Sequence, residues 1–475
     1  MPHLLAIDVG TTGTKAALFD HTGRLAANAV SEYPLLTPRG SWVEQDAEDW
    51  WQAVVLTVRQ VLAAGPRDVR ALSLSTQGGA WAPLDTGGNA LRPALSWMDK
   101  RADAIGRRLE AQKGAEWLYR LSGWSVGGGL PLLLTCWLRE HEPEVFGQAA
   151  YFADTHAFVA HRLTGRLVTD HSNAAITQFY DLTNADWSPA ACVFAGVDVD
   201  QLPALRRAGE PFGQLTPTAA AELGLPGETM VCVGGHDQYC AALGAGVTRE
   251  GTCLLSCGTA WVALVDSPTL VFDPARKVSP GTHVIQDHWG LLTSVPVAGA
   301  SFRWFRDRFR PGRPYEAVSA EAAAAPPGCG GLLFLPSNLR ERPGSAFVDL
   351  DLSHDGAHLA RAIMEGVAFA VRRNAEAISA LGVATQGLTM IGGGARSDCW
   401  SQIVADVCQV PVTLPTQAEA ACAGAAVLAG LGAGVFPEAQ AAAESFTGIA
   451  RLREPLAANA AVYTDQYGRF LQALT

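Results

Sequence analysis

Charged residues are scarce in this sequence, and the basic ones form no run. All charged residues together make up 17% of the 475 residues, and the formal net charge is −11. Without a basic patch, nucleic acid is not expected as a partner. Nucleotide binding stays open, because it depends on local hydrogen-bond donors and a metal ion rather than on net charge.

Long apolar runs and targeting signals are also missing. No window of about 18 uncharged apolar residues predicts a membrane span. Met1 to Leu4 lead directly into an apolar stretch without a basic region, so no signal peptide is expected. Ten cysteines are scattered without metal-ligand spacing, which is typical of reduced thiols used as small apolar side chains. These features predict a cytoplasmic protein with no membrane partner.

The spacing of a Walker A phosphate loop is absent too, but the first twenty residues predict another kind of phosphate grip. An apolar run ends in Asp8, a turn of Gly and Thr follows, and a second apolar run comes next, which predicts a β-hairpin. Gly10 and Gly13 admit turn conformations that bulkier residues avoid. Backbone amides and three hydroxyls could then surround an anion, those of Thr11, Thr12 and Thr14.

Two charged side chains flank this predicted turn. Asp8 is placed where a carboxylate can hold Mg²⁺, directly or through water. Lys15 adds a positive charge nearby. The alternative is an ordinary hairpin with a polar tip.

The segments that follow predict an α/β domain. Trp42 to Ala64 predicts a helix that Asp46 caps and Gly65 stops, and Leu91 to Trp97 predicts a short strand. Three antiparallel strands followed by alternating helices and strands suit a ribonuclease-H-like domain.

A second hairpin echoes the first. Thr252 to Asp266 again contains an apolar strand, a Gly258-Thr259 turn and another apolar strand. We interpret this echo as a weak internal duplication, so the length divides into two predicted domains, 1–246 and 247–475. Gly258 and Thr259 would offer donors to phosphates from an opposite wall.

A third polar segment follows the apolar strand that begins at Met230. The strand ends in Gly234-Gly235-His236-Asp237-Gln238, and a small-residue helix follows. A carboxylate at the mouth of a strand and the start of a helix suits a general base. The alternative is that Asp237 only caps the helix.

Four further segments carry weaker signals. Gln77 follows a predicted strand, and Trp97 begins the segment W-x-D-x-R. Thr169 to Ala175 predicts a polar loop. Gly392 to Ser397 joins a strand to a capped helix, where glycines let the backbone approach a base or phosphate closely.

Four of these segments resemble, in their order, motifs of the FGGY carbohydrate kinases. They are Asp8–Lys15, Trp97–Arg101, Gly234–Gln238 and Gly392–Ser397. The resemblance extends over nearly the whole chain. It implies two ribonuclease-H-like α/β domains flanking a cleft, as in the superfamily of actin, Hsp70 and sugar kinases.

The resemblance also implies a reaction and roles for residues. The family moves the γ-phosphoryl group of ATP, bound with Mg²⁺, to a sugar or polyol hydroxyl. Asp237 would then be the catalytic base, and Asp8 would be catalytic as the metal ligand. The implied phosphate ligands are Thr11, Thr12, Gly13, Lys15, Gly258 and Thr259. The implied adenosine ligands are Gly393, Gly394 and Ala395, and the implied sugar ligands are Gln77, Trp97, Asp237 and Gln238.

The substrate and the assembly are less defined. D-xylulose is the first expectation, with D-ribulose, L-ribulose and glycerol- or erythritol-like polyols as alternatives. Gly78 and Gly79 depart from the bulkier residues that follow this glutamine in many members, which leaves the sugar open. Family members are often dimers, so a homodimer is one expectation. The helix predicted over Glu419 to Leu431 suits close packing beneath the adenosine loop.

Two alternatives come from other classes. An ATPase scaffold of the actin or Hsp70 type would need polymer contacts or a peptide-binding domain, and no extra domain is visible in the sequence. A catalytically silent sugar sensor would not need both Asp8 and Asp237.

Overall fold

The computed structural model of the chain describes residues 3–337 and 344–474, and it divides into two compact units. Unit 1 consists of Met1–Thr248, Pro268–Gly290 and Glu419–Thr447, and unit 2 consists of Arg249–Ser267, Leu291–Ala418 and Gly448–Thr475. The domain boundary expected between residues 246 and 247 stays a prediction. The loop that the sequence singles out at Ser337–Pro343 lies, except for Ser337, outside the described residues.

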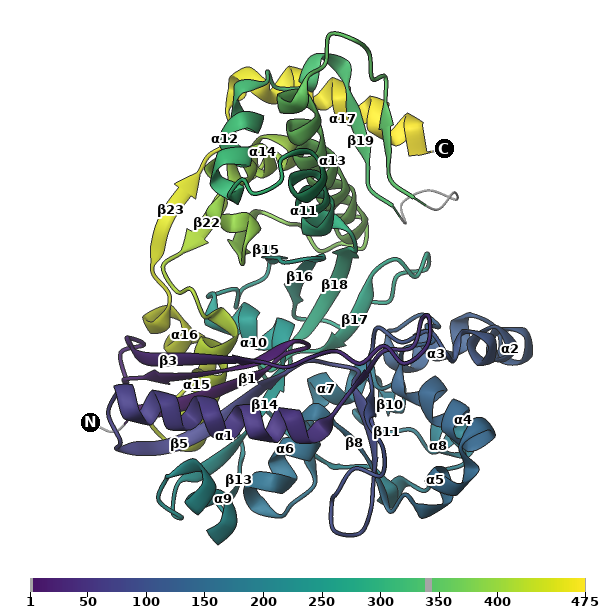
Figure 1. Cartoon of the computed structure of the whole chain (residues 1–475), viewed down its shortest axis with the longest axis vertical. Helices are drawn as coiled ribbons and strands as arrows, with labels where there is room; N and C mark the ends of the chain where they lie inside the picture. The colour runs from purple at the N-terminus through teal and green to yellow at the C-terminus, as the bar shows by residue number, and fades with distance from the viewer. Residues whose placement is uncertain (1–2, 338–343, 475) are drawn as a thin grey trace. The chain divides into compact units, whose positions relative to one another are not determined.

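Unit 1 is built on a six-stranded sheet with the strand order β13-β14-β5-β1-β2-β3 (Figure 1). Its strands are β1 (His3–Val9), β2 (Gly13–Phe19), β3 (Leu25–Glu32), β5 (Val69–Thr76), β13 (Pro211–Gln214) and β14 (Met230–His236). The first three strands pair antiparallel, and β5 runs parallel to both β1 and β14. The predicted amino-terminal hairpin is therefore confirmed.

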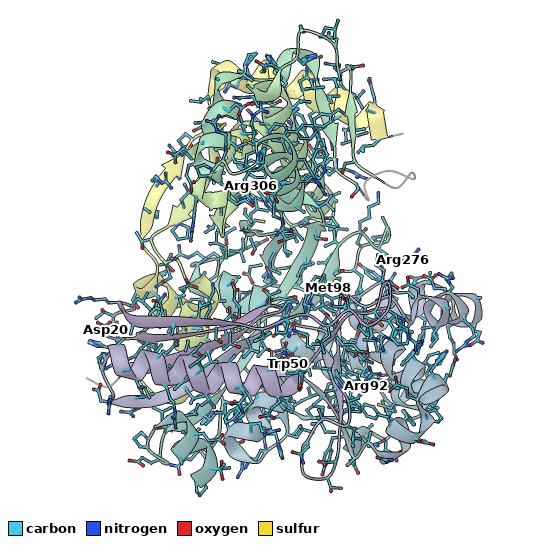
Figure 2. All side chains as sticks on the ribbon, viewed as in Figure 1. Asp20, Trp50, Arg92, Met98, Arg276 and Arg306 are labelled. Carbon is cyan, nitrogen blue, oxygen red and sulfur yellow. The ribbon has the colours of Figure 1, made fainter. Side chains whose placement is uncertain are left out.

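Helices cover both faces of this sheet because side chains alternate along its strands. Leu5 and Ile7 of β1 join the core beneath α1 (Ala47–Ala64), where Trp50, labelled in Figure 2, is fully buried. Asp46 caps α1 and Gly65 ends it, as predicted. Leu4 faces the other way, toward α15 (Ala420–Gly432).

Helix α15 corrects one expectation. It packs against α10 (Asp237–Gly244) and strands β1 and β5, so it belongs to unit 1. Backbones approach closely there, because a Cβ on Gly424 would lie 1.9 Å from the carbonyl oxygen of Cys240. The small residues therefore serve this helix pair, and the expectation that they pack beneath the adenosine loop was wrong.

The remaining elements of unit 1 include a smaller sheet with the order β4-β7-β6-β8. Its strands are β4 (Glu44–Gln45), β6 (Trp81–Leu84), β7 (Ala94–Leu95) and β8 (Tyr151–Asp154). The strand expected over Leu91 to Trp97 is thus limited to two residues. The other strands are β9 (Val168–Asp170), β10 (Tyr180–Asp181), β11 (Asp186–Trp187), β12 (Ala204–Arg206) and β17 (Ser279–Thr282). The helices are α2 (Asp103–Lys113), α3 (Glu116–Ser122), α4 (Pro131–His141), α5 (Pro143–Gln148), α6 (Thr155–Thr164), α7 (His171–Ile176), α8 (Pro189–Ala195), α9 (Pro217–Leu223) and α16 (Ala439–Phe446).

The segment from Thr169 to Ala175 is ordered and buried, so the predicted polar loop was wrong. It contains the end of β9 and most of α7. Asp170 is 1% exposed, and its carboxylate caps α7 by accepting hydrogen bonds from the amides of Ser172 and Asn173. Helix α7 has only six residues, which is too short to show the apolar periodicity by which a helix is predicted from sequence.

Unit 2 repeats the central strand pattern of unit 1. Six of its strands follow the order β18-β16-β15-β21-β22-β23. They are β15 (Thr252–Cys257), β16 (Trp261–Ser267), β18 (Trp289–Val295), β21 (Gly387–Ile391), β22 (Val412–Pro415) and β23 (Ile449–Arg453). The hairpin β15–β16 is antiparallel, and β21 runs parallel to β15, just as β5 runs parallel to β1.

The described residues of unit 2 also form five α-helices. They are α11 (Ala298–Phe309), α12 (Tyr315–Ala324), α13 (Gly356–Ser379), α14 (Asp398–Cys408) and α17 (Ala460–Leu474), and a two-stranded sheet joins β19 (Leu333–Leu335) to β20 (Ala346–Val348). Among the described residues, no helix combines the length and apolar character needed to cross a membrane.

Candidate active site

Three parallel strands of unit 1 end side by side and bring the predicted acidic residues to one edge of the sheet. In the registers of β1, β5 and β14, Asp8 pairs with Ser75, and Ser75 pairs with Gly235. Gln77 and Asp237 each follow within two residues of these pairs. The carboxyl ends of parallel strands are where α/β sheets bind ligands.

The carboxyl group of Asp8 has a strongly shifted pKa at this edge. Its Oδ1 accepts a hydrogen bond of 2.7 Å from Ser75 Oγ. The pKa of Asp8 is raised to about 6, first by burial and then by the negative charge of Asp237, against the opposing effects of Ser75 and Lys15. The two carboxylates are therefore close enough to repel each other, and a cation between them would relieve that repulsion.

The donor set at this edge fits magnesium. Mg²⁺ prefers oxygen ligands, keeps several waters, and takes one or two carboxylates together with substrate phosphates. Asp8 and Asp237 supply two such carboxylates. Within residues 3–337 and 344–474, no three His, Cys, Asp or Glu side chains gather into an all-protein metal site.

The hairpin tip between β1 and β2 is held by backbone hydrogen bonds. The amide of Gly10 donates to the carbonyl of Gly13 at 2.9 Å, and Tyr33 Oη donates to the carbonyl of Gly10 at 2.5 Å. Neither glycine has a positive φ, so the expected reason for them was wrong. A Cβ on Gly13 would lie 2.9 Å from the carbonyl oxygen of Ser31, so close strand approach requires this glycine.

The contacts of Lys15 do not fit a role in phosphate binding alone. Its Nζ donates to Glu419 Oε2 at 2.8 Å, and its side chain is 43% exposed. Burial lowers the pKa of Lys15 and the hydrogen bond with Glu419 raises it, with a net rise. Lys15 is therefore protonated and paired, and its binding of a nucleotide phosphate stays a prediction.

Asp237 is the first residue of α10 rather than its cap. His236 holds the cap position and makes no side-chain capping bond, so the structure does not support the capping alternative. The Asp237 side chain is 30% exposed, with Oδ1 3.3 Å from His236 Nε2. Gly234 permits this strand end, because a Cβ there would lie 1.6 Å from the carbonyl oxygen of Leu74.

Two predicted sugar ligands meet near Thr11. Gln77 Nε2 donates to Gln45 Oε1 at 3.1 Å, and Gln45 Nε2 donates to the carbonyl of Thr11 at 2.8 Å. Trp97 Nε1 donates to Thr11 Oγ1 at 3.2 Å, and its side chain is 45% exposed. Gln238 Oε1 is buried without a hydrogen-bond partner. No motif in the sequence pointed to Gln45.

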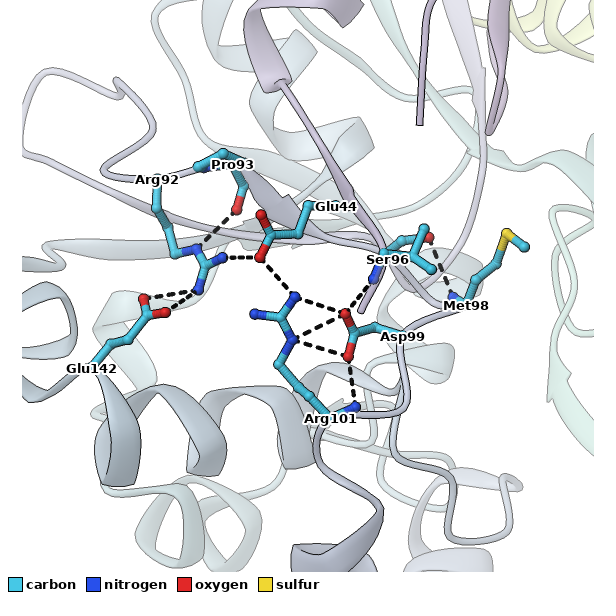
Figure 3. Close-up of polar contacts among 9 residues, drawn as sticks. Glu44, Arg92, Pro93, Ser96, Met98, Asp99, Arg101 and Glu142 are labelled. Atoms are coloured by element: carbon cyan, nitrogen blue, oxygen red, sulfur yellow. Dashed lines mark hydrogen bonds and ion pairs between the residues drawn. The ribbon is translucent and has the colours of Figure 1, made fainter. Parts of the chain in front are cut away.

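The two charged residues of the W-x-D-x-R segment, Asp99 and Arg101, bond to neighbouring protein side chains. Figure 3 shows Arg101 between Asp99 and Glu44, at distances of 2.8 and 2.7 Å. The Arg101 guanidinium also lies 4.0 Å from the centre of the Trp42 ring. Asp99 accepts the amide of Val43 at 2.6 Å. This buried network fixes the backbone that presents Trp97.

Unit 2 contains a cavity of about 610 Å³ at the tip of its hairpin. Gly258, Thr259, Gly393 and Gly394 line it, whereas the predicted ligand Ala395 is not among the lining residues. Gly392 has φ +83°, and a Cβ there would lie 3.1 Å from the carbonyl oxygen of Cys257.

Aromatic side chains form one wall of this cavity, and the sequence analysis did not predict them. Trp400 lies with its ring centre 5.2 Å from that of Phe302, and Phe302 stacks on Tyr315 at 6.3 Å. Arg306, labelled in Figure 2, lies 3.9 Å from the centre of the Tyr315 ring. These residues come from α11, α12 and α14, which have no shared motif in the sequence.

Comparison with known proteins agrees with this arrangement. Residues 3–244 match the N-terminal domain of the FGGY family of carbohydrate kinases, and residues 253–433 match its C-terminal domain. The chain belongs to the FGGY family of carbohydrate kinases. The predicted family, the two-domain α/β fold and the kinase class are thereby confirmed, and ATP as a substrate follows from the family.

Relatives of this FGGY kinase differ in their named substrates. The chain is 31% identical to a xylulose kinase of Bacillus subtilis, over 100% of this chain and 97% of the relative. It is 30% identical to an autoinducer-2 kinase of Klebsiella pneumoniae, over 100% and 96%. A crystal structure of xylulose kinase from Rhodospirillum rubrum superposes with a TM-score of 0.91 at 29% identity, covering 99% of this chain and 98% of that one.

Proposed function

We propose that this FGGY kinase phosphorylates a ketopentose, with D-xylulose as the first candidate, and that Asp237 is the base. The observation that carries the proposal is the pair of carboxylates at the ends of β1 and β14, the two strands that flank β5. Asp8 and Asp237 interact strongly enough to contribute to the raised pKa of Asp8, and Asp237 is partly exposed. Similarity to xylulose kinases supports the choice of sugar.

The sugar would bind at the strand ends of unit 1. Trp97 offers a half-exposed aromatic face to the apolar face of a sugar. Gln77 and Gln238 offer amides for hydroxyl groups, and Gln238 Oε1 is available because it has no partner among the described residues. Buried polar groups favour hydrogen-bonded ligands, since leaving them unpaired costs free energy.

In the proposed reaction, a sugar hydroxyl gives its proton to the Asp237 carboxylate. The hydroxyl oxygen forms a bond to the γ-phosphorus of ATP, and the bond to the β-phosphate oxygen breaks, which releases ADP. Asp8 would hold Mg²⁺, which supplies charge neutralisation when bound. Amides and hydroxyls of Thr11, Thr12 and Gly13 are proposed phosphate ligands.

The nucleotide would occupy the cavity of unit 2. Gly258 and Thr259 line it and are proposed phosphate donors, while Gly393 and Gly394 let the backbone approach adenosine. Phe302, Tyr315 and Trp400 would supply the apolar surface that a flat base needs.

One alternative has its own support. The similarity to an autoinducer-2 kinase is of the same size as that to the xylulose kinases. At Gly78 and Gly79 the protein also has no side chain that could select one substrate, and His236 and Trp97 pack into that space instead. Other ketoses, such as D-ribulose and L-ribulose, and small polyols therefore stay as second candidates.

The deciding experiment is a substrate panel in a coupled assay of ADP release. D-xylulose should give the highest kcat/KM among D-xylulose, D-ribulose, L-ribulose, gluconate, glycerol and erythritol. A higher value for another sugar would replace the substrate, and no sugar-dependent ADP release from any of them would contradict the proposed function. Light scattering would test the homodimer that is common in the family.

A further inference from the structure

His236 is a polar side chain next to the proposed base, and the proposed reaction assigns it no role. Its side chain is 8% exposed, and its Nε2 lies 3.3 Å from Asp237 Oδ1. Its Nδ1 is buried and has no hydrogen-bond partner among the described residues. A buried imidazole with one nitrogen unpaired is costly for stability alone, so a second benefit is needed to explain it.

The ring of His236 fills the space that a side chain at position 78 would occupy. A Cβ on Gly78 would lie 2.5 Å from His236 Cδ2 and 2.6 Å from Nε2, closer than real side chains approach. The ring of Tyr239 lies 5.7 Å away, between ring centres. Gly78 therefore makes room for the imidazole, and together these neighbours restrict its rotation.

The backbone of His236 is anchored by the buried segment that caps α7. Its amide donates to Ser172 Oγ at 2.9 Å. Ser172 in turn donates to the carboxylate of Asp170 through its hydroxyl and, at 2.6 Å, through its amide. The strand end that carries Asp237 is thus anchored by hydrogen bonds through Ser172 to Asp170, and the His236 ring packs against Gly78.

We propose that His236 is a positioning residue that fixes the carboxylate of Asp237 through Nε2. This inference rests on the proposed role of Asp237 as the base. With its proton on Nε2, the imidazole donates toward Oδ1 and restricts the rotation of the carboxylate, leaving Oδ2 for the sugar hydroxyl. A base that is misplaced by about 1 Å can lose ~10²-fold in rate.

The first experiment compares three substitutions of His236. His236→Ala should lower kcat for the sugar by roughly 10²-fold, with the KM for ATP unchanged. In His236→Gln, the amide nitrogen reaches about as far as Nε2, so most of kcat should return. In His236→Asn, the shorter amide takes the place of Nδ1 and should restore little. Melting temperatures show how much of each variant is folded.

A second experiment uses Gly78. Gly78→Ala should displace the ring and reduce kcat in the wild-type background. In the His236→Ala background, the same substitution should have a much smaller effect, because coupled residues give non-additive changes. Equal effects in both backgrounds would contradict the pairing of Gly78 with His236.

The chain offers a matched control. His161 also lies over a glycine, since a Cβ on Gly88 would lie 2.2 Å from its Cε1, and neither residue belongs to the proposed site. His161→Ala should change the melting temperature without changing kcat per folded molecule. It measures what removal of a packed imidazole costs in general.

Asp237→Ala separates failure of this inference from failure of the proposed function. If Asp237→Ala keeps its turnover, the proposed base itself is wrong. If Asp237→Ala is inactive while His236→Ala has a wild-type kcat per folded molecule, or if Gln restores no more than Asn, then the positioning role is wrong.

Discussion

The hairpins β1–β2 and β15–β16 share a topology and differ in chemistry. Each is antiparallel, each tip contains glycine followed by threonine, and the first strand of each runs parallel to a later strand. Two residues before the tip glycine, β1 has Asp8 and β15 has Ser256. One hairpin therefore ends in charge and the other does not.

The residues around the two hairpin tips differ in the same way. Asp8 lies near Asp237 and Lys15, and its pKa is raised to about 6 mainly by burial. The tip of β15–β16 lines a cavity with an aromatic wall. With the proposed roles, one backbone scaffold would serve metal and proton chemistry in one copy and nucleotide binding in the other, depending on a few side chains.

The largest effect is expected for Asp237, the proposed base. Asp237→Ala should lower kcat by ~10²–10⁴-fold, because a positioned base typically contributes that much. Nucleotide binding should survive, since the proposed cavity is in unit 2. Steady-state kinetics and ATP titration would measure both, and a destabilised variant with full kcat per folded molecule would make Asp237 purely structural.

The next effect comes from making the two hairpins alike. Asp8→Ser gives β1 the residue of β15 and should lower kcat by roughly 10²-fold, as expected when a charge-stabilising group is lost. A higher Mg²⁺ concentration should recover part of the lost kcat. The reciprocal variant, Ser256→Asp, should instead raise the KM for ATP by repelling phosphates. Unchanged turnover of Asp8→Ser at ordinary Mg²⁺ would remove Asp8 from the mechanism.

A smaller effect is expected in the cavity of unit 2. Gly393 has helical φ and ψ, and a Cβ there would meet nothing closer than the carbonyl oxygen of Cys257 at 3.8 Å. Gly393→Leu should therefore fold, fill part of the cavity and raise the KM for ATP about tenfold, or about 1.4 kcal/mol. The KM for the sugar should not change. Gly468→Leu, at a helical position with open space, is the matched control.

The smallest effect concerns stability without Mg²⁺. The folded pKa of Asp8, about 6, lies above the ordinary aspartate value of 3.8, so ionisation of Asp8 destabilises the fold as pH rises from 4 to 7. Asp8→Asn removes this penalty and should melt higher than wild type by roughly 2–4 °C above pH 7. Below pH 4 the difference should vanish. Melting curves across this range would show a constant difference if Asp8 were unperturbed.

Local patterns predicted much of this molecule. Asp8, Asp237 and both hairpins could be found because apolar strands ending in polar turns are visible in a single segment. The aromatic wall of Phe302, Tyr315 and Trp400 could not, since it comes from three helices whose approach depends on packing. Asp170 was misread for a related reason: its partners lie in a helix too short for periodicity.

The position of α15 in the chain has a consequence for synthesis. This helix covers the Leu4 face of the sheet of unit 1, and Glu419 beside it pairs with Lys15, 404 residues earlier. At about 5–20 residues per second, a ribosome needs roughly 20–80 s to reach Glu419. The Leu4 face of β1 therefore stays exposed until α15 is synthesised. During that time the nascent chain needs protection from aggregation. Truncation before Glu419 should unfold unit 1 as well as shorten unit 2.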